Sequence, residues 1–162
     1  MTEQKYLKTF EYLKSKKLVP LIIFLLKFST VAVYITYPTL LAWLLYIKSS
    51  QVLCVVLVPF ISFVLVTLFR NYKNAKRPYE IYGFKPLTPK NSQGKSFPSR
   101  HTFSAFVIAT CALSVNAILG GLLLLLGAII ALSRVLLGLH FIKDVAFGAV
   151  IGIVLGSVIF VL

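Results

Sequence analysis

Residues 118–137 read ILGGLLLLLGAIIALSRVLL, a run of twenty residues in which Arg134 is the only charge. A helix of this length spans about 30 Å, the thickness of the hydrocarbon core of a bilayer. The whole chain of 162 residues is 59% hydrophobic and only 13% charged. We therefore expect an integral membrane protein.

Further apolar runs lie on both sides of this segment. They cover Val52 to Phe69, Thr102 to Ala117 and Val145 to Leu162, with short breaks near Asn116 and from Gly138 to Lys143. Backbone groups in lipid must satisfy their own hydrogen bonds, and these runs lack the alternation of barrel strands, so we predict helices. The fold class is an all-α polytopic membrane bundle of five or six transmembrane helices, forming one domain over residues 1–162.

The number of spans depends on the run from Leu18 to Ile47. This run is too long for one span of about 20 residues and short for two. The pattern favours a half-inserted helix followed by a full span near Thr30 to Ile47.

Three other features complete the organisation of the chain. Residues 2–17 alternate lysines with tyrosine, phenylalanine and leucine, which predicts a basic amphipathic helix on the membrane surface. The polar stretch from Arg70 to Ser96 contains three prolines and two glycines and is predicted to be a loop. Gly148, Gly152 and Gly156 recur at four-residue spacing, a pattern typical of closely packed membrane helices.

The charge of the chain limits the class of its partner. The net charge is +13, which by itself could indicate a nucleic-acid binder. A mean hydropathy of +0.92 leaves little surface for a duplex. We therefore expect an anionic membrane lipid, and no nucleic acid, as the partner.

The rarest polar residues fall at one face of the predicted bundle. Lysine occurs thirteen times, but arginine only four times, histidine twice and aspartate once. Counting the predicted crossings brings all seven of these rare residues to the same face, although they come from distant parts of the chain. Ionisable groups at membrane depth are costly and by default mark a functional path. These residues are Arg70, Arg77, Arg100, His101, Arg134, His140 and Asp144.

The residue types indicate phosphate chemistry. Several guanidinium groups with few acids make a site for an anion, and the guanidinium fork matches phosphate oxygens well. Pro98 and Ser99 also predict a helix start with free backbone N–H groups aimed at the site. Two histidines and a carboxylate can form an iron-type ligand set, but four nearby arginines would repel a divalent cation. No metal or other cofactor is therefore predicted.

The two histidines suggest separate roles. His140 and Asp144 are four residues apart, so the carboxylate can orient the ring and leave the other ring nitrogen free as a nucleophile or base. His101 supplies a second group that can donate a proton and later accept one.

In three motifs the chain resembles the type 2 phosphatidic acid phosphatases, which share their site with vanadium haloperoxidases. The first family motif, lysine, six residues and Arg-Pro, corresponds to Arg70 through Arg77-Pro78. The second, Pro-Ser-Gly-His, corresponds to Pro98-Ser99-Arg100-His101. The third, Ser-Arg, five residues, His, three residues and Asp, is matched in full by Ser133-Arg134, His140 and Asp144.

Two positions within residues 70–144 depart from the family pattern. Arg70 replaces the usual lysine and keeps the charge. Arg100 replaces the usual glycine, and it either adds a phosphate contact or narrows the range of substrates.

The resemblance implies a metal-independent lipid phosphatase. His140 would attack phosphorus and form a phosphohistidine while Asp144 holds its ring, and His101 would protonate the leaving oxygen and then activate water. The phosphoryl oxygens would be held by Arg70, Arg77, Ser99, Arg100 and Arg134.

The sequence leaves more than one choice for the substrate and for the membrane face of the site. Candidate substrates are undecaprenyl pyrophosphate, phosphatidate and phosphatidylglycerol phosphate, each with its tail in the bilayer. The resemblance favours an extracytoplasmic site in the cell membrane, whereas the N-terminal lysines favour a cytoplasmic start. A non-catalytic protein that binds or moves anionic lipids is the rival function, and a haloperoxidase is disfavoured because those relatives are soluble.

Overall fold

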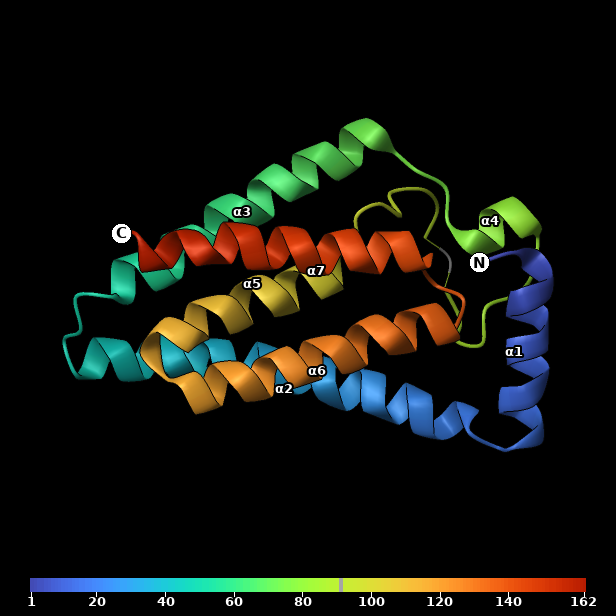
Figure 1. Ribbon diagram of the computed structural model, residues 1–162, viewed down its shortest axis with the longest axis horizontal. Helices are drawn as coiled ribbons and strands as arrows, with labels where there is room; N and C mark the ends of the chain where they lie inside the picture. The colour runs from blue at the N-terminus through green and yellow to red at the C-terminus, as the bar shows by residue number, and fades with distance from the viewer. Residues whose placement is uncertain (91) are drawn as a thin grey trace.

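The regular structure of the chain is helical throughout residues 1–90 and 92–162, which the computed structural model describes. Figure 1 shows α2, α3, α5, α6 and α7 running along the long axis of the molecule, with α1 lying across one end. The elements are α1 (Glu3–Ser15), α2 (Val19–Tyr46), α3 (Val52–Lys73), α4 (Pro78–Tyr82), α5 (Arg100–Val115), α6 (Ala117–Leu136), α7 (Ile142–Gly156) and the 3₁₀-helix η1 (Ser157–Phe160).

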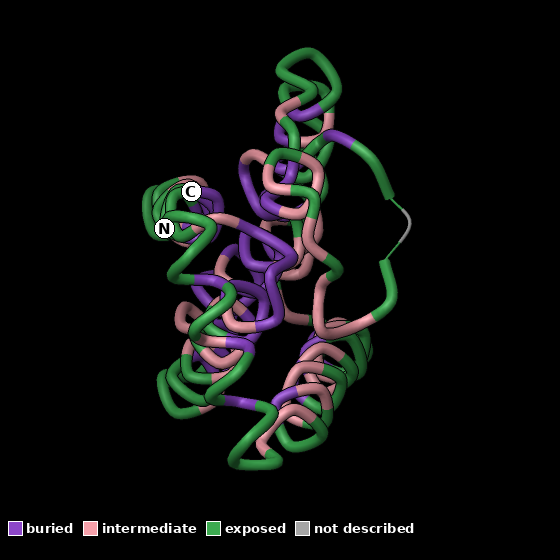
Figure 2. Tube along the Cα trace, turned by 90° about the vertical axis from the view of Figure 1, so that its right-hand side faces the viewer, coloured by how far each residue is buried: buried purple, intermediate pink, exposed green. Residues whose placement is uncertain are grey.

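The length and surface of these helices fit a membrane. Four segments are long and apolar enough to cross one, namely Val19–Tyr46, Val52–Tyr82, Ala117–Leu136 and Ile142–Phe160. Large apolar side chains point outward from them, among them Phe24, Leu65 and Val154. Figure 2 shows the exposed residues around a buried centre. The predicted helical membrane bundle is confirmed.

The prediction for Leu18 to Ile47 was wrong, because this run forms one continuous helix. The 28 residues of α2 are about 42 Å long, and Pro38 lies inside the helix without ending it. A break at that depth would expose several unpaired backbone groups to lipid, whereas one proline removes a single hydrogen bond. This run therefore provides one candidate span in a single helix, and the predicted half-inserted helix is not formed.

The short helix α5 is the centre of the bundle and packs on α6 and α7. Phe103, Ala109 and Cys111 in α5 are fully buried. A Cβ atom on Gly152 of α7 would lie only 2.8 Å from the carbonyl oxygen of Phe103. Gly148 and Gly156 approach α5 as closely, so the glycines permit the close contact of helices that their spacing predicts.

The prediction of one loop from Arg70 to Ser96 also needs correction. The helix α3 continues to Lys73, so Arg70 is helical, and Pro78–Tyr82 forms the short helix α4. The backbone N–H of Arg77 donates to Glu80 Oε2 at 2.8 Å and fixes the start of α4. Proline at the first helical position needs no hydrogen-bond partner for its nitrogen, which favours a start at Pro78.

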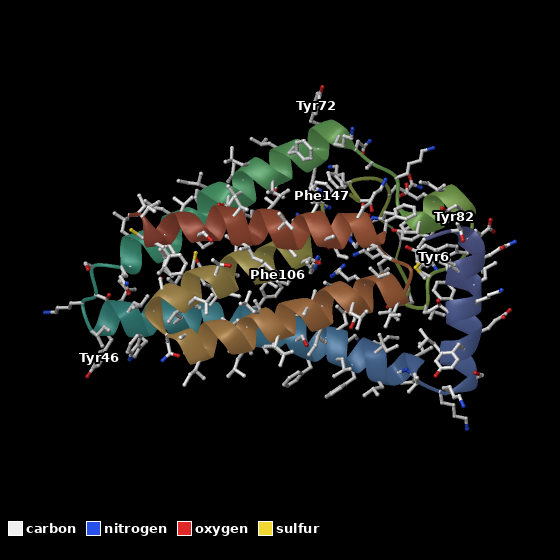
Figure 3. All side chains as sticks on the ribbon, viewed as in Figure 1. Tyr6, Tyr46, Tyr72, Tyr82, Phe106 and Phe147 are labelled. Atoms are coloured by element: carbon white, nitrogen blue, oxygen red, sulfur yellow. The ribbon has the colours of Figure 1, made fainter. Side chains whose placement is uncertain are left out.

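The N-terminal helix is tied to the end of the bundle that also holds α4 and the α6–α7 junction. Tyr6, Phe10 and Leu13 on one face of α1 are buried, while its lysines are exposed. Tyr6 and Tyr82 meet at this end with ring centroids 6.4 Å apart (Figure 3), and Tyr46 lies at the opposite end. The N-terminus and the α6–α7 junction therefore share one face of the bundle.

Candidate active site

A basic cavity of about 380 Å³ opens at the end of the bundle where α1 and α4 lie. We call this space the basic cavity. Six of the seven rare residues singled out in the sequence line it, and Asp144 lies behind His140. The lining residues are Thr67, Arg70, Asn71, Arg77, Lys90, Ser92, Gln93, Gly94, Lys95, Arg100, His101, Arg134 and His140.

His140 and Asp144 form a buried pair behind the basic cavity. His140 Nδ1 lies 3.4 Å from Asp144 Oδ2, and the two side chains are 2% and 1% exposed. Asp144 is in the first turn of α7, where its Oδ2 also accepts from the backbone N–H of Phe141 at 3.1 Å. The start of the helix therefore fixes the carboxylate, and the carboxylate in turn orients the imidazole.

Ser96 joins this pair, and the sequence reasoning missed it. Its hydroxyl donates to Asp144 Oδ2 at 2.5 Å and lies 3.3 Å from His140 Nδ1. The side chain is completely buried. A serine in a polar loop carries no distinguishing signal, so only the folded chain reveals the contact.

The opposite nitrogen of His140 faces the arginines. Arg77 Nη1 lies 3.3 Å from His140 Nε2, and because a guanidinium can only donate, Nε2 must accept there. Burial lowers the pKa of His140 to about 4, against the opposing effect of Asp144. The ring is therefore neutral at pH 7 and keeps a lone pair on Nε2.

The backbone of His140 is held by a residue 134 positions earlier in the chain. The Tyr6 hydroxyl donates to the His140 carbonyl oxygen at 3.0 Å. Burial raises the pKa of Tyr6, so the hydroxyl keeps its proton and remains a donor. Nothing in the N-terminal pattern beyond its amphipathic period could have indicated this contact.

The four arginines occupy different environments. Arg70 donates to the carbonyl oxygens of Lys95, Ser96 and Pro98, and Arg77 donates to those of Gly94 at 3.1 Å and Leu139 at 3.3 Å. These two buried side chains therefore tie the loop after α4 to α3 and to the α6–α7 junction. The other two are Arg134, which is buried and whose Nε has no hydrogen-bond partner among the described residues, and Arg100, which is exposed.

The start of α5 brings two more predicted residues to the site. His101 is in the first turn of α5, is partly exposed and lines the basic cavity. Ser99 precedes the helix but is fully buried, and its backbone N–H donates to the Asp144 carbonyl oxygen at 2.8 Å. The Ser99 side chain accepts from Thr102 Oγ1 at 3.0 Å and is not among those that line the basic cavity.

The basic cavity is strongly positive. None of its described lining residues is acidic, whereas Lys90 and Lys95 add to the arginines. The surrounding protein lowers the pKa of Lys90, and the nearby Arg77, Arg134 and Arg100 lower it further. Sequence reasoning missed Lys90, because one lysine among thirteen does not stand out.

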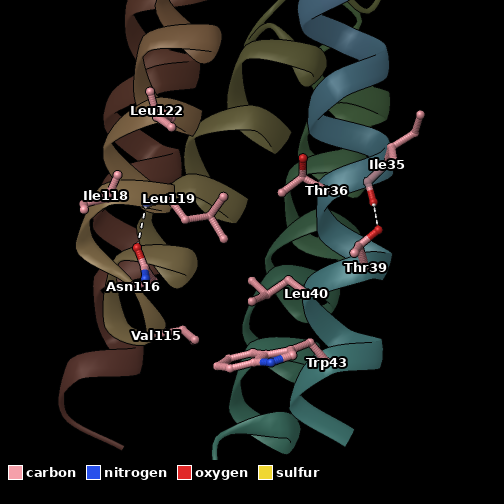
Figure 4. Close-up of a pocket in the computed structure, with 10 residues that line it drawn as sticks. All are labelled: Ile35, Thr36, Thr39, Leu40, Trp43, Val115, Asn116, Ile118, Leu119 and Leu122. Atoms are coloured by element: carbon pink, nitrogen blue, oxygen red, sulfur yellow. Dashed lines mark hydrogen bonds between the residues drawn. The ribbon is translucent and has the colours of Figure 1, made fainter. Parts of the chain in front are cut away.

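A separate cavity of about 710 Å³ lies between α2 and the α5–α6 junction (Figure 4). It is lined by Leu40, Trp43, Asn116 and other residues, none of which is ionisable. Asn116 Oδ1 accepts from the backbone N–H of Leu119 at 2.9 Å and caps α6. This cavity therefore offers none of the ionisable groups that line the basic cavity.

Comparison with known families accounts for this arrangement. The family model of the PAP2 superfamily matches residues 51–162. The chain belongs to the PAP2 superfamily. The resemblance stated from the motifs is confirmed, and membership makes the chain a phosphoric ester hydrolase in the membrane.

Two solved structures share the fold. The crystal structure of Aquifex aeolicus LpxE is 30% identical in sequence with a TM-score of 0.72, and the match covers 88% of this chain and 86% of that one. A PAP2-type phosphatidylglycerolphosphate phosphatase from Bacillus subtilis is 20% identical with a TM-score of 0.69, and the match covers 88% of this chain and 75% of that one. At this level of identity the second match supports the fold only. No curated protein matches the chain in sequence.

Proposed function

We propose that this PAP2 protein removes phosphate from a membrane lipid without a metal, through a phosphohistidine at His140. The observation that supports this most is the buried His140–Asp144 pair, whose Nε2 is on the side of the basic cavity, beside Arg77. A protein that only bound anionic lipids would need the arginines but not a neutral imidazole held by a carboxylate. The substrate is a lipid phosphomonoester or pyrophosphate, for which undecaprenyl pyrophosphate, phosphatidate and phosphatidylglycerol phosphate are the candidates.

In the first step, His140 Nε2 forms a bond to phosphorus as the bond from phosphorus to the lipid oxygen breaks. The electron pair stays on the lipid oxygen, which takes a proton from His101. In the second step His101 takes a proton from water, and the resulting hydroxide displaces His140 and releases inorganic phosphate. Asp144 offsets the positive charge that develops on the His140 ring.

The arginines contribute in two ways. Arg134 is placed to donate to the phosphoryl oxygens and offset their charge in the transition state, and Arg100 adds positive charge to the lining of the same cavity. Arg70 and Arg77 line the same cavity but also hold the loop backbone, so they preorganise the site as well as charge it. Ser99 does not line the basic cavity. Its contribution is the hydrogen bond from its backbone N–H, at the start of α5, to the Asp144 carbonyl oxygen.

We place the lipid tail in an apolar space beside the site. An apolar groove of about 490 Å³ lies between α2, α3 and α5 and is lined by Tyr37, Phe60, Phe63 and Val107 among others. We call it the apolar groove. A tail in this groove would leave its phosphate at the basic cavity while staying within the depth of the bilayer.

The decisive experiment measures phosphate release by the detergent-purified protein with a chelator present. We expect turnover of at least one of the three candidate lipids, inhibition by vanadate, and loss of turnover in His140→Ala and His101→Ala although both variants fold. Unchanged turnover in both variants would reject the mechanism. Lipid binding without any turnover by the unmodified protein would favour the rival, a non-catalytic lipid-binding protein.

We further propose that the site opens at the extracytoplasmic face of the cell membrane. Because α1 and the site share one end of the bundle, the N-terminus must then be extracytoplasmic too. The lysines of α1 would favour the opposite orientation. Labelling a Lys8→Cys variant, made without Cys54 and Cys111, with an impermeant maleimide in intact cells decides between them, since a cytoplasmic site leaves the introduced thiol unlabelled.

A further inference from the structure

Arg100 stands apart from the other arginines of the basic cavity. Its side chain is exposed, while Arg70, Arg77 and Arg134 are only 6–7% exposed. Arg70 and Arg77 donate to carbonyl oxygens of the loop, but Arg100 makes no such bond within the described part of the chain. Its guanidinium carbon instead lies 5.7 Å from the ring centroid of Phe63. Arg100 is therefore a cation whose donors are not taken up by the described residues.

The position of Arg100 is the boundary between two spaces. Arg100 lines the basic cavity, and Phe63, beneath it, lines the apolar groove. The next residue is His101, the group proposed to protonate the leaving oxygen. A substrate attacked at His140 with its tail in the apolar groove would therefore pass Arg100 between the transferred phosphate and the tail.

The charge at this boundary limits what the substrate carries there. In phosphatidate the atoms beyond the breaking bond belong to uncharged diacylglycerol, whose ester oxygens offer a guanidinium neutral hydrogen bonds but no ion pair. In phosphatidylglycerol phosphate the next anion is a phosphodiester one glycerol unit further on. In a lipid diphosphate the inner phosphate is joined directly to the bridging oxygen, and this anion matches the guanidinium fork. The buried Arg134 and Arg77 remain available for the outer phosphate.

Building on the proposed function, we infer that the substrate is a lipid diphosphate and that Arg100 binds its inner, non-transferred phosphate. His140 Nε2 bonds to the outer phosphorus while the bond from that phosphorus to the bridging oxygen breaks. The electron pair goes to the bridging oxygen, so a lipid monophosphate leaves. Water then hydrolyses the phosphohistidine to inorganic phosphate and restores His140. Arg100 stabilises the charge that the leaving monophosphate gains.

The test compares two lipids with identical acyl chains, diacylglycerol diphosphate labelled in its outer phosphate and phosphatidate. Both are presented to the full chain in mixed micelles with a chelator. The unmodified protein should prefer the diphosphate in kcat/KM. In Arg100→Gly that value should fall on the order of tenfold to a hundredfold for the diphosphate, the loss expected for a hydrogen bond between charged groups, and less than about threefold for phosphatidate. Arg100→Lys should recover part of the loss.

Lys85→Gln is the matched control, because Lys85 is exposed at the same end and lines none of the cavities described above. It should leave both activities unchanged. An equal fall of kcat/KM on both lipids in Arg100→Gly would assign Arg100 to the transferred phosphate. Unchanged kcat/KM on both lipids would assign it to packing on Phe63 or to lipid headgroups. Either result overturns the inference while leaving the phosphatase function standing. Absence of turnover on both lipids by the unmodified protein would reject the function itself.

Discussion

Ser96→Ala tests whether the buried hydroxyl behind His140 is needed for catalysis. Asp144 Oδ2 accepts from the Ser96 hydroxyl at 2.5 Å and from the Phe141 N–H at 3.1 Å, and lies 3.4 Å from His140 Nδ1. The substitution removes the shortest of these contacts. A hydrogen bond to a charged group contributes about 1.5–3 kcal/mol, which corresponds to about a 10- to 150-fold fall in kcat if the bond acts in the transition state.

The fold should survive, because the Ser96 backbone N–H still donates to the Ala75 carbonyl oxygen at 2.8 Å. KM should change less than about threefold, since Ser96 does not line the basic cavity. Steady-state phosphate release and acid-quenched trapping of phosphohistidine measure the two effects. Ser62→Ala, a buried serine in α3, controls for the loss of any buried hydroxyl. An unchanged kcat in Ser96→Ala, with or without a raised KM, would refute the assignment of Ser96 as a positioning residue.

Three further predictions follow from contacts at the site and in the bundle. Tyr6→Phe keeps the ring packing but loses the hydrogen bond to the His140 carbonyl oxygen, so kcat should fall about 2- to 12-fold. The control Tyr12→Phe changes an exposed tyrosine of the same helix and should not alter kcat. Equal kcat in both variants would show that the Tyr6 hydrogen bond is not needed for catalysis. Because burial lowers the pKa of His140 to about 4, its ring should stay neutral as the pH falls from 7 towards 4. Near pH 4 the ring should become protonated at Nε2 and cease to be a nucleophile. Histidine NMR of the labelled protein, assigned with His101→Gln, measures this directly, and a midpoint near 6.5 would contradict it. Gly152→Val brings a side chain against the α5 backbone and should lower the thermal midpoint by about 2 to 12 °C. Gly121→Val, where a Cβ meets open space, should unfold near the normal temperature, and the same midpoint for both would argue against close α5–α7 packing.

Much of the fold could be predicted because hydrophobic runs of span length leave the backbone one option in lipid. The ends of α3, α5 and α6 fall within a few residues of the predicted boundaries, since charges and Asn116 mark them in the sequence. The run from Leu18 to Ile47 was misjudged for a physical reason: hydropathy measures the preference for lipid but not whether a helix bends, tilts or stops within it. Packing against neighbouring helices decides that.

For the site, the sequence by itself determined which residues are scarce, how far apart they are and that an even number of crossings brings them to one face. The tertiary structure alone decided what each of them contacts there. It committed Arg70 and Arg77 to loop carbonyls, left Arg100 free over Phe63, and brought Ser96 and Tyr6 to His140. Periodicity and motif spacing describe neighbours along one helix, whereas contacts between residues 44 or 134 positions apart exist only once the helices have packed.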